Sequence, residues 1–215
     1  IVSRRQRQMC IRDRVWAAGV SGGLWSITNI ENASSEWTKV SDFWDTLNIT
    51  SVATDPTDAN IIYIGTGEKR GMGLKGFGVW KTSDGGSTWN QLSSSTGFKW
   101  IDTIIVRDEG GVGAVYVGGG RSLSEGEYTG INGLQKSTDG GATWTEVLGE
   151  IAAGSSHHVT DLEIDSNNRL IVGTRTNTFG DGGGQIFYSD DGAVFSPYTI
   201  GALGQFDRTF VDVSP

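Results

Sequence analysis

The side chains of this chain that could do chemistry lie in long loops between short apolar runs. Carboxylates, arginines and aromatic rings recur together in segments 68–77, 121–132 and 175–183. Aromatic rings can stack on the faces of sugar rings, while charged side chains bond the sugar hydroxyls. We therefore expect a ligand-binding surface on these loops. The candidate ligand residues are Glu68, Arg70, Trp44, Trp100, Arg121, Glu125, Glu127, Tyr128, Arg175, Asp181 and Arg208.

The carboxylates among these candidates keep hydrolysis of a glycosidic bond open. That reaction needs two carboxylates, about 5–5.5 Å apart for retention of configuration or about 6.5–9.5 Å apart for inversion. The sequence supplies several carboxylates but no distances, so the catalytic residues stay unassigned. A carboxylate pair beside exposed Trp44 and Trp100, acting as sugar platforms, would favour an enzyme over a binding protein.

Other site chemistries are not indicated. One cysteine and two histidines cannot complete a zinc site, and we expect no metal and no cofactor. His157 and His158 adjoin in a loop segment and are expected to be solvated. Residues 71–76 match a glycine-rich phosphate-binding pattern, but the run that follows is predicted as a strand, whereas that pattern requires a helix.

Composition limits the classes of fold and partner. The 215 residues include 33 glycines, 8 tryptophans and 3 prolines, with a formal net charge of −8. An acidic chain has few cations to neutralise phosphates, so nucleic acid is not an expected partner. No run of 18 apolar residues occurs, so no membrane span is expected. The high glycine content predicts many turns, but the sequence lacks the Gly-X-Y period of collagen, and the tryptophans argue against a disordered chain. We therefore expect a turn-rich globular fold.

The elements that position the loops come from an internal repeat. Segments 78–92, 133–147 and 185–198 read GVWKTSDGGSTWNQL, GLQKSTDGGATWTEV and QIFYSDDGAVFSPY. Each repeat of about 50 residues contains four short β-branched or aromatic runs separated by turn residues, without a helical period. Four short strands in a unit of that length are typical of a β-propeller blade.

The predicted fold class is therefore all-β, a β-propeller of four-stranded blades present as an incomplete arc. The arc has three complete blades and two partial blades. A propeller protects its edges by closing its ring, so we expect the remainder of the propeller to be missing from this chain. The expected limits are a partial blade at 15–47, blades at 48–98, 99–156 and 157–204, and a partial blade at 205–215.

Residues 1–14 are set apart from this reasoning. Segment 4–14 reads RRQRQMCIRDR and holds five arginines and the lone cysteine. It resembles the translation of a transposase-type sequencing adapter, whose codons match Met9 to Arg14. We interpret residues 1–14 as a non-native artefact and leave them out of the fold prediction.

The repeats resemble the Asp-box, or BNR, motif S/T-x-D-x-G-x-T-W. Residues 82–89 and 137–144 match it in full, and residues 188–195 match it as a decayed copy. In that family the motif is a structural turn between the third and fourth strands, in which aspartate accepts hydrogen bonds from turn amides. The resemblance implies this role for Thr82, Asp84, Gly86, Thr88, Trp89, Ser137, Asp139, Gly141, Thr143, Trp144, Asp190, Gly192 and Phe195.

The sequences of the repeats resemble those of secreted bacterial proteins of the xyloglucanase-like type and of sortilin (Vps10)-like receptors. This resemblance implies an extracellular or cell-surface location and a polysaccharide, glycan or extracellular protein partner. Our leading expectation is a carbohydrate- or protein-binding module without chemistry of its own. The alternative is a polysaccharide endo-hydrolase of the xyloglucanase type. A sialidase is less favoured, because an Arg-Ile-Pro segment is absent although Arg70, Arg121 and Arg175 suggest an arginine triad.

Overall fold

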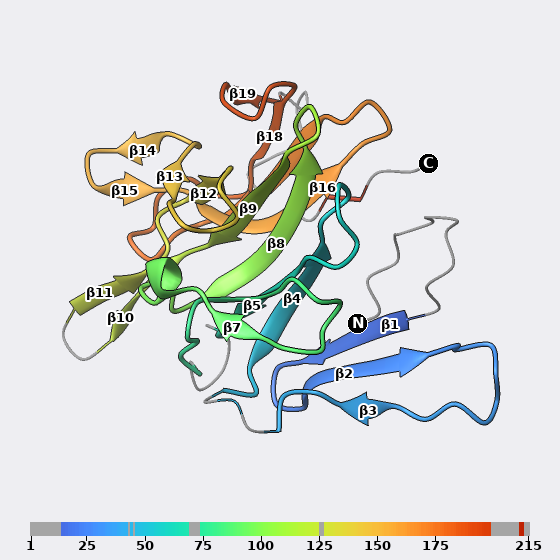
Figure 1. Ribbon diagram of the computed structural model, residues 1–215. Helices are drawn as coiled ribbons and strands as arrows, with labels where there is room; N and C mark the ends of the chain where they lie inside the picture. The colour runs from blue at the N-terminus through green and yellow to red at the C-terminus, as the bar shows by residue number, and fades with distance from the viewer. Residues whose placement is uncertain are drawn as a thin grey trace.

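The computed structural model describes residues 14–42, 44, 46–68, 74–124, 127–198 and 211–212. These residues form antiparallel sheets joined by turns and loops, and the all-β class is confirmed. Four sheets follow one another along the chain and lie side by side in Figure 1; we name them blades 1 to 4. Blade 1 comprises β1 (Arg14–Gly19), β2 (Gly23–Thr28) and β3 (Thr38–Lys39). Blade 2 comprises β4 (Ile49–Thr54), β5 (Ile62–Thr66), β6 (Val79–Thr82) and β7 (Asn90–Gln91).

The other two blades also have four strands each. Blade 3 comprises β8 (Ile101–Asp108), β9 (Gly113–Gly119), β12 (Leu134–Ser137) and β13 (Thr145–Glu146). Blade 4 comprises β16 (His158–Ile164), β17 (Leu170–Arg175), β18 (Ile186–Ser189) and β19 (Ser196–Pro197).

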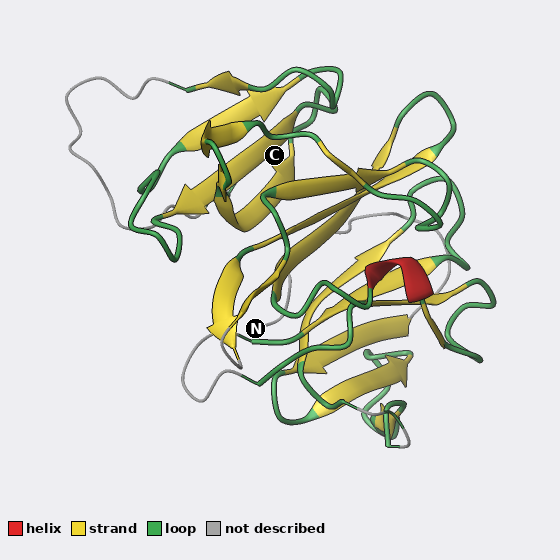
Figure 2. Cartoon of the chain, turned by 90° about the vertical axis from the view of Figure 1, so that its left-hand side faces the viewer, coloured by secondary structure: helices red, strands yellow, loops and turns green. Residues whose placement is uncertain are grey.

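Two hairpins lie outside the blades. The first, formed by β10 (Arg121–Ser124) and β11 (Glu127–Gly130), is inserted between β9 and β12. The second, formed by β14 (Glu150–Ala152) and β15 (Ser155–Ser156), lies in the connection from β13 to β16. A short 3-10 helix, η1 (Ser93–Ser95), occupies the equivalent connection from β7 to β8 and is red in Figure 2. These insertions enlarge the connections at one end of the blades.

The antiparallel order gives the blades two faces. The connections β5–β6, β9–β12 and β17–β18 emerge at the same end as the connections that lead from one blade to the next. We name this end the loop face. The β6–β7, β12–β13 and β18–β19 hairpins emerge at the other end, the turn face. The segments that carry the candidate ligand residues therefore belong to the loop face.

The hydrophobic core lies between neighbouring blades. Tyr63, Ile104 and Val117 are buried between blades 2 and 3, and Leu134 and Leu162 are buried between blades 3 and 4. Complete burial of such a side chain contributes about 1.5–3 kcal/mol to folding. The apolar runs of the repeats thus hold the blades against one another.

Two glycines set how closely the blades approach. A Cβ atom on Gly65 would lie 2.5 Å from Ile101 Cγ2, and one on Gly118 would lie 2.4 Å from Val159 Cγ1. Ile101 and Val159 belong to the first strands of the following blades and are fully buried. Glycine in the second strand therefore lets the next blade pack directly against the sheet.

The turn face carries the aspartates of the repeated motif. Asp84 Oδ1 accepts hydrogen bonds from Thr88 N (2.9 Å) and Thr82 Oγ1 (2.7 Å), and its Oδ2 accepts one from Thr88 Oγ1 (2.7 Å). Asp139 accepts the equivalent bonds from Thr143 and Ser137. The bonds from Thr88 and Thr143 are the main cause that lowers the pKa of each carboxyl below its ordinary value. Both carboxylates thus hold the turn that contains them.

The smaller motif residues also have defined contacts. Gly86 N donates to Thr82 Oγ1 at 2.9 Å, and Gly141 N donates to Ser137 Oγ at 2.8 Å. The bulky residue that ends each motif packs against a cluster between blades; these residues are Trp89, Trp144 and Phe195.

In the third repeat the structure corrects the predicted aspartate. Asp191 accepts hydrogen bonds at Oδ1 from Ser189 Oγ (3.0 Å), Ala193 N (2.9 Å) and Val194 N (2.8 Å). The carboxylate of Asp190 instead pairs with the exposed Arg169 at 2.6 Å. Asp191, and not Asp190, therefore holds the third turn.

The strand register explains this correction. Leu170 pairs with Ser189 where Ile62 pairs with Thr82, so Ser189 is the counterpart of Thr82. Gly192 N donates to Ser189 Oγ at 2.9 Å, three residues apart in the sequence, whereas the corresponding residues of the second and third blades are four apart. The third turn is one residue shorter, and a motif of fixed length aligns its aspartate one position too early.

The aspartate turns of blades 3 and 4 are each docked on the preceding blade through a contact that we name an inter-blade latch. A cationic side chain of one blade donates to a glycine carbonyl in the turn of the next blade. The pairs are Lys81 Nζ with Gly140 O (3.1 Å) and Lys136 Nζ with Gly192 O (3.3 Å). At the turn of blade 2, Gly85 O accepts from Arg14 Nη1, but Arg14 belongs to the segment that we interpret as non-native.

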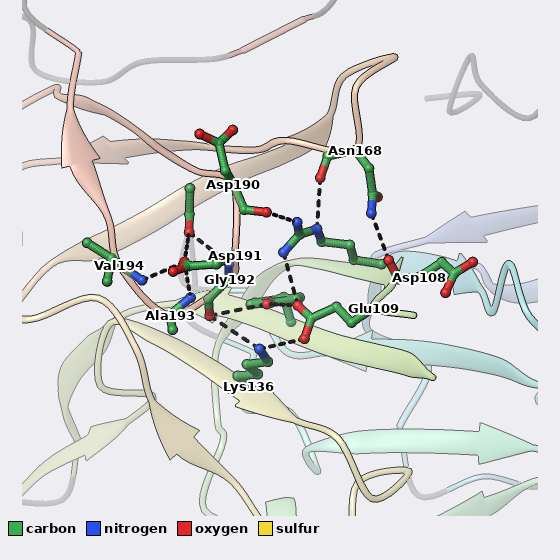
Figure 3. A network of polar contacts seen from close by, with 12 residues as sticks. Asp108, Glu109, Lys136, Asn168, Asp190, Asp191, Gly192, Ala193 and Val194 are labelled. Atoms are coloured by element: carbon green, nitrogen blue, oxygen red, sulfur yellow. Dashed lines mark hydrogen bonds and ion pairs between the residues drawn. The ribbon is translucent and has the colours of Figure 1, made fainter. Parts of the chain in front are cut away.

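The latch between blades 3 and 4 extends into a buried network (Figure 3). Arg107, 4% exposed, donates through Nε to Asn168 O (2.9 Å), through Nη1 to Glu109 Oε1 (3.1 Å) and through Nη2 to Asp190 O. Glu109 Oε2 also pairs with Lys136 Nζ at 2.7 Å. The guanidinium thus joins backbone carbonyls of blade 4 to a carboxylate of blade 3.

The described residues form an open arc of blades. Val211 N donates to Asp161 Oδ2 at 3.0 Å, as Ile104 N donates to Ser51 Oγ at 3.0 Å between blades 2 and 3. Val211 therefore takes the place that Ile104 has within β8, in the first strand of a blade. The predicted incomplete arc agrees with this arrangement, while the blade limits taken from the repeats stay a prediction.

Candidate functional site

A histidine–aspartate pair joins blades 3 and 4 at the loop face. Asp102 near the start of β8 lies 2.6 Å, Oδ2 to Nε2, from His158 at the start of β16. A carboxylate only accepts hydrogen bonds, so Nε2 carries the proton. His158 is 1% exposed, and a Cβ atom on Gly120 would lie 2.4 Å from its Nδ1. The imidazole thus supports the residue from which the β10–β11 hairpin emerges.

The neighbouring histidine is also buried, which corrects the expectation that both would be solvated. The ring of His157 meets Phe187 edge to face, with 4.8 Å between centroids. Burial lowers the pKa of His157. Among the described residues, Nδ1 of His157 and Nδ1 of His158 have no hydrogen-bond partner. Contacts with the loop connections therefore cover most of both rings.

The β17–β18 loop is tied to the connection that contains the second hairpin. Asn177 Nδ2 donates to Ser155 Oγ (2.8 Å) and to Ser156 O (3.0 Å). Ser155 Oγ in turn donates to Asp181 Oδ2 at 2.7 Å. Three polar side chains of two separate loops therefore form one closed set of hydrogen bonds.

A hollow opens beside this set, between blades 3 and 4. It takes residues from the β9–β12 connection, from the start of β16 and from the β17–β18 loop. Its lining residues are Gly120, Arg121, Ile131, Ser156, His157, His158, Asn177, Thr178 and Phe179.

The structure brings some of the predicted ligand residues to this hollow. Arg121 lines it, and Asp181 belongs to the loop that borders it. Arg175 ends β17, from which that loop continues. Glu68 lies apart, beyond β5 of blade 2, where its backbone bridges to Leu74. Glu127 and Tyr128 belong to β11, while Arg70, Glu125 and Arg208 lie outside the described residues.

Trp44 and Trp100 do not form exposed platforms, which corrects the enzyme hypothesis that relied on them. Trp100 is 3% exposed, and a Cβ atom on Gly130 would lie 3.0 Å from its Cε3. Trp44 is half-buried and stacks on Trp80 at 4.7 Å between centroids and 9° between planes. Large rings at these positions fill space between blades, because they bury the most apolar area there.

The exposed aromatic residue at the hollow is one that sequence reasoning did not single out. Phe179 is 43% exposed and lies on the hollow's rim. Its signal was present in the sequence, as an aromatic residue within the polar segment 175–183. The pairing of Asp102 with His158 had no such signal, because 56 residues separate them.

Two absences hold for the part of the chain that the structure describes. It contains no group of three or more histidine, cysteine, aspartate or glutamate residues able to hold a metal ion. No helix within that part is long and apolar enough to cross a membrane.

Comparison with curated proteins finds xyloglucanases from several organisms. The Paenibacillus sp enzyme is 29% identical over 129 residues, which are 50% of this chain and 11% of that protein. Xyloglucanase Xgh74A of Acetivibrio thermocellus is 30% identical over 142 residues, or 60% and 15% of the two chains. The Hypocrea jecorina enzyme is 32% identical over 121 residues, or 46% and 13%. The match thus spans less than a sixth of each relative's length, and no protein-family model matches the chain.

Comparison with solved structures identifies the fold. An ancestral GH74 enzyme superposes with a TM-score of 0.62 and 19% identity over 91% of this chain and 25% of that chain. YjhT superposes with a TM-score of 0.56 and 13% identity over 90% of this chain and 64% of that chain. These likenesses confirm the predicted class, an arc of β-propeller blades.

Proposed function

We propose that this chain is part of a polysaccharide-degrading propeller protein of the xyloglucanase type and that its loop face binds the polysaccharide. The likeness to three xyloglucanases from separate organisms is the observation that carries the proposal. The same proposal includes an extracellular location, because a long polysaccharide chain is degraded outside the cell. The aspartate turns are proposed as Asp-box turns with a structural role.

The loop face has the chemistry that this proposal needs. Sugar recognition combines apolar ring faces with hydrogen-bonding groups that are fixed in advance. Phe179 and Arg121 supply an aromatic ring and a guanidinium at one hollow, and Asn177 holds the loop that carries Phe179. The proposal assigns substrate binding to Phe179 and Arg121 and leaves the catalytic carboxylate pair unassigned.

A binding protein without hydrolytic activity is the second candidate. This second candidate is favoured by the hydrogen bonds of Asp102 and Asp181, the two carboxylates described above beside the hollow. Asp102 pairs with His158, and Asp181 accepts a hydrogen bond from Ser155. Both carboxylates are thus held by neighbouring side chains, and the binding-protein candidate gives them a structural role.

Incubation of the protein with soluble xyloglucan separates the two candidates. The xyloglucanase proposal predicts release of reducing ends, with mixed-linkage β-glucan and galactomannan as comparison substrates. Retention of the protein on a xyloglucan gel without release of reducing ends would support the binding protein. Neither retention nor release would contradict both.

A further inference from the structure

We propose a subsite at which one neutral pyranose ring binds over the rim of the hollow between blades 3 and 4, with the exposed Phe179 as the platform on which the ring stacks. This inference rests on the proposed function and adds to it the position of a sugar ring and the class of sugar. It starts from an exposed aromatic side chain on a loop that hydrogen bonds hold in place.

The loop that presents Phe179 is fixed by one side chain within it. Asn177 Oδ1 accepts hydrogen bonds from Phe179 N (2.9 Å) and Asp181 N (3.0 Å). At the base of the loop, the buried Thr174 accepts a bond from Gln185 N (3.0 Å). The backbone on both sides of Phe179 is therefore ordered before any ligand arrives.

The same loop is anchored to both hairpins of the loop face. Asn177 Nδ2 reaches Ser155 and Ser156 of the β14–β15 hairpin, and Thr178 Oγ1 donates to Arg121 O at the start of β10. Ordering a loop on binding costs free energy, and a loop that is ordered in the free protein avoids that cost. A preorganised exposed ring is what a sugar-binding platform requires.

The apolar surface continues beyond the ring. Ile151 of β14 is partly exposed, and a Cβ atom on Gly182 would lie 2.7 Å from its Cδ1. Ile151 therefore packs on the loop that carries Phe179. The apolar C–H face of a pyranose can rest on such a surface, while its hydroxyls face the polar edge of the hollow that Arg121 lines.

The charges around the hollow favour a neutral sugar. Arg121 is the cation that lines it, and the carboxylates of Asp102 and Asp181 lie on adjoining segments. His157 and His158 line it as well, and burial lowers the pKa of His157, which favours its uncharged form. Arg175, which pairs in register with His158, adds a second guanidinium, and two guanidinium groups beside two carboxylates provide no net positive charge for the carboxylate of an acidic sugar.

The test compares three side chains at position 179 for binding to polysaccharides. Phe179→Leu keeps an apolar side chain but removes the ring, and Phe179→Trp keeps a ring. Trp37→Leu removes a ring of similar exposure, 42%, on the turn face and serves as the control. Dissociation constants are measured with xyloglucan, mixed-linkage β-glucan, galactomannan and polygalacturonate. Thermal unfolding of each variant shows that the fold is kept.

The subsite predicts that Phe179→Leu weakens binding of a neutral polysaccharide about tenfold, while Phe179→Trp and Trp37→Leu stay close to wild type. If wild type binds another neutral polysaccharide but not xyloglucan, and Phe179→Leu loses that binding, the subsite stands and the xyloglucan assignment fails. Equal binding by wild type and Phe179→Leu overturns the subsite alone. Binding of polygalacturonate only, or of no polysaccharide, overturns it as well.

Discussion

At the residue scale, the aspartates of the turn face act on stability through the hydrogen bonds that each carboxylate accepts. Asp84 and Asp139 each hold a threonine at both its amide and its hydroxyl. Asp191 holds two amides and a serine hydroxyl, and these bonds lower its pKa to about 2. Asp190 lies next to it in the sequence and holds no group of the turn through its carboxylate. Asp191 therefore stabilises the turn, whereas the carboxylate of its neighbour Asp190 does not.

Substitution of this pair tests the assignment. Asp191→Ala removes the acceptor of Ala193 N and Val194 N, so we expect the melting temperature to fall by several degrees. Asp190→Ala removes only an exposed ion pair with Arg169 and is expected to leave the melting temperature almost unchanged. Thermal unfolding of both variants measures the difference. A larger fall in melting temperature for Asp190→Ala would show that Asp190 holds the turn, as the sequence alignment of the motif predicts.

Acid unfolding follows from the same bonds. The unfolded aspartates bind protons near their ordinary pKa of 3.8, whereas the folded ones bind them only at lower pH. The unfolded state therefore takes up more protons, and the stability that the turns provide above about pH 4 declines as the pH falls through the folded pKa of each aspartate, which is about 2 for Asp191 and lower for Asp84 and Asp139. Urea midpoints at pH 7, 4 and 2.5 should decline for wild type and decline less for Asp139→Asn. Parallel declines for the two proteins would contradict this account.

At the scale of elements, the inter-blade latches couple the turns of blades 3 and 4 to the sheets before them. The latch of blade 3 belongs to a larger network, in which Arg107 and Lys136 share Glu109 between them (Figure 3). Removing a buried cation from water is costly, and its hydrogen bonds offset that cost, so loss of one partner leaves the others uncompensated. The order of the blades is therefore held by polar contacts at the turn face as well as by the core.

Arg107→Met is the direct test of the latch. It leaves Glu109 and two carbonyls of blade 4 without the guanidinium, and we expect a loss of about 3 kcal/mol in the free energy of unfolding. Urea denaturation measures the loss. Arg169→Met removes an exposed arginine of blade 4 and is the matched control, with little change expected. Similar midpoints for the two variants would show that the network does not stabilise the junction.

The elements themselves were accessible from the sequence where local chemistry specifies them. The repeated apolar runs predicted the strands of blades 2 to 4. The motif copies at 82–89 and 137–144 predicted two turns, because the residues that form each turn lie next to one another in the sequence. The Asp191 shift escaped prediction because a one-residue deletion becomes visible only in the register of Leu170 and Ser189. The latches escaped it because partners such as Lys81 and Gly140 lie in different blades.

At the scale of the whole molecule, the arc separates a turn face with the aspartate turns from a loop face to which we assign ligand binding. The sequence located the loops of the candidate site but not its exposed ring. Tryptophans were expected to serve as platforms, yet Trp100 is buried beneath the β10–β11 hairpin and the smaller Phe179 is exposed. Burial of an aromatic ring depends on how neighbouring blades pack, and that packing cannot be read from a single segment.

Hydrogen exchange with and without xyloglucan is the most direct test of the claim that the loop face binds the polysaccharide. The account predicts slower exchange in peptides that cover residues 120–124, 150–158 and 174–185, which surround the hollow. Peptides that cover the aspartate turns at 83–89, 138–144 and 190–195 should exchange at the same rate in both samples. Protection confined to the aspartate turns, or no protection in any peptide, would contradict it.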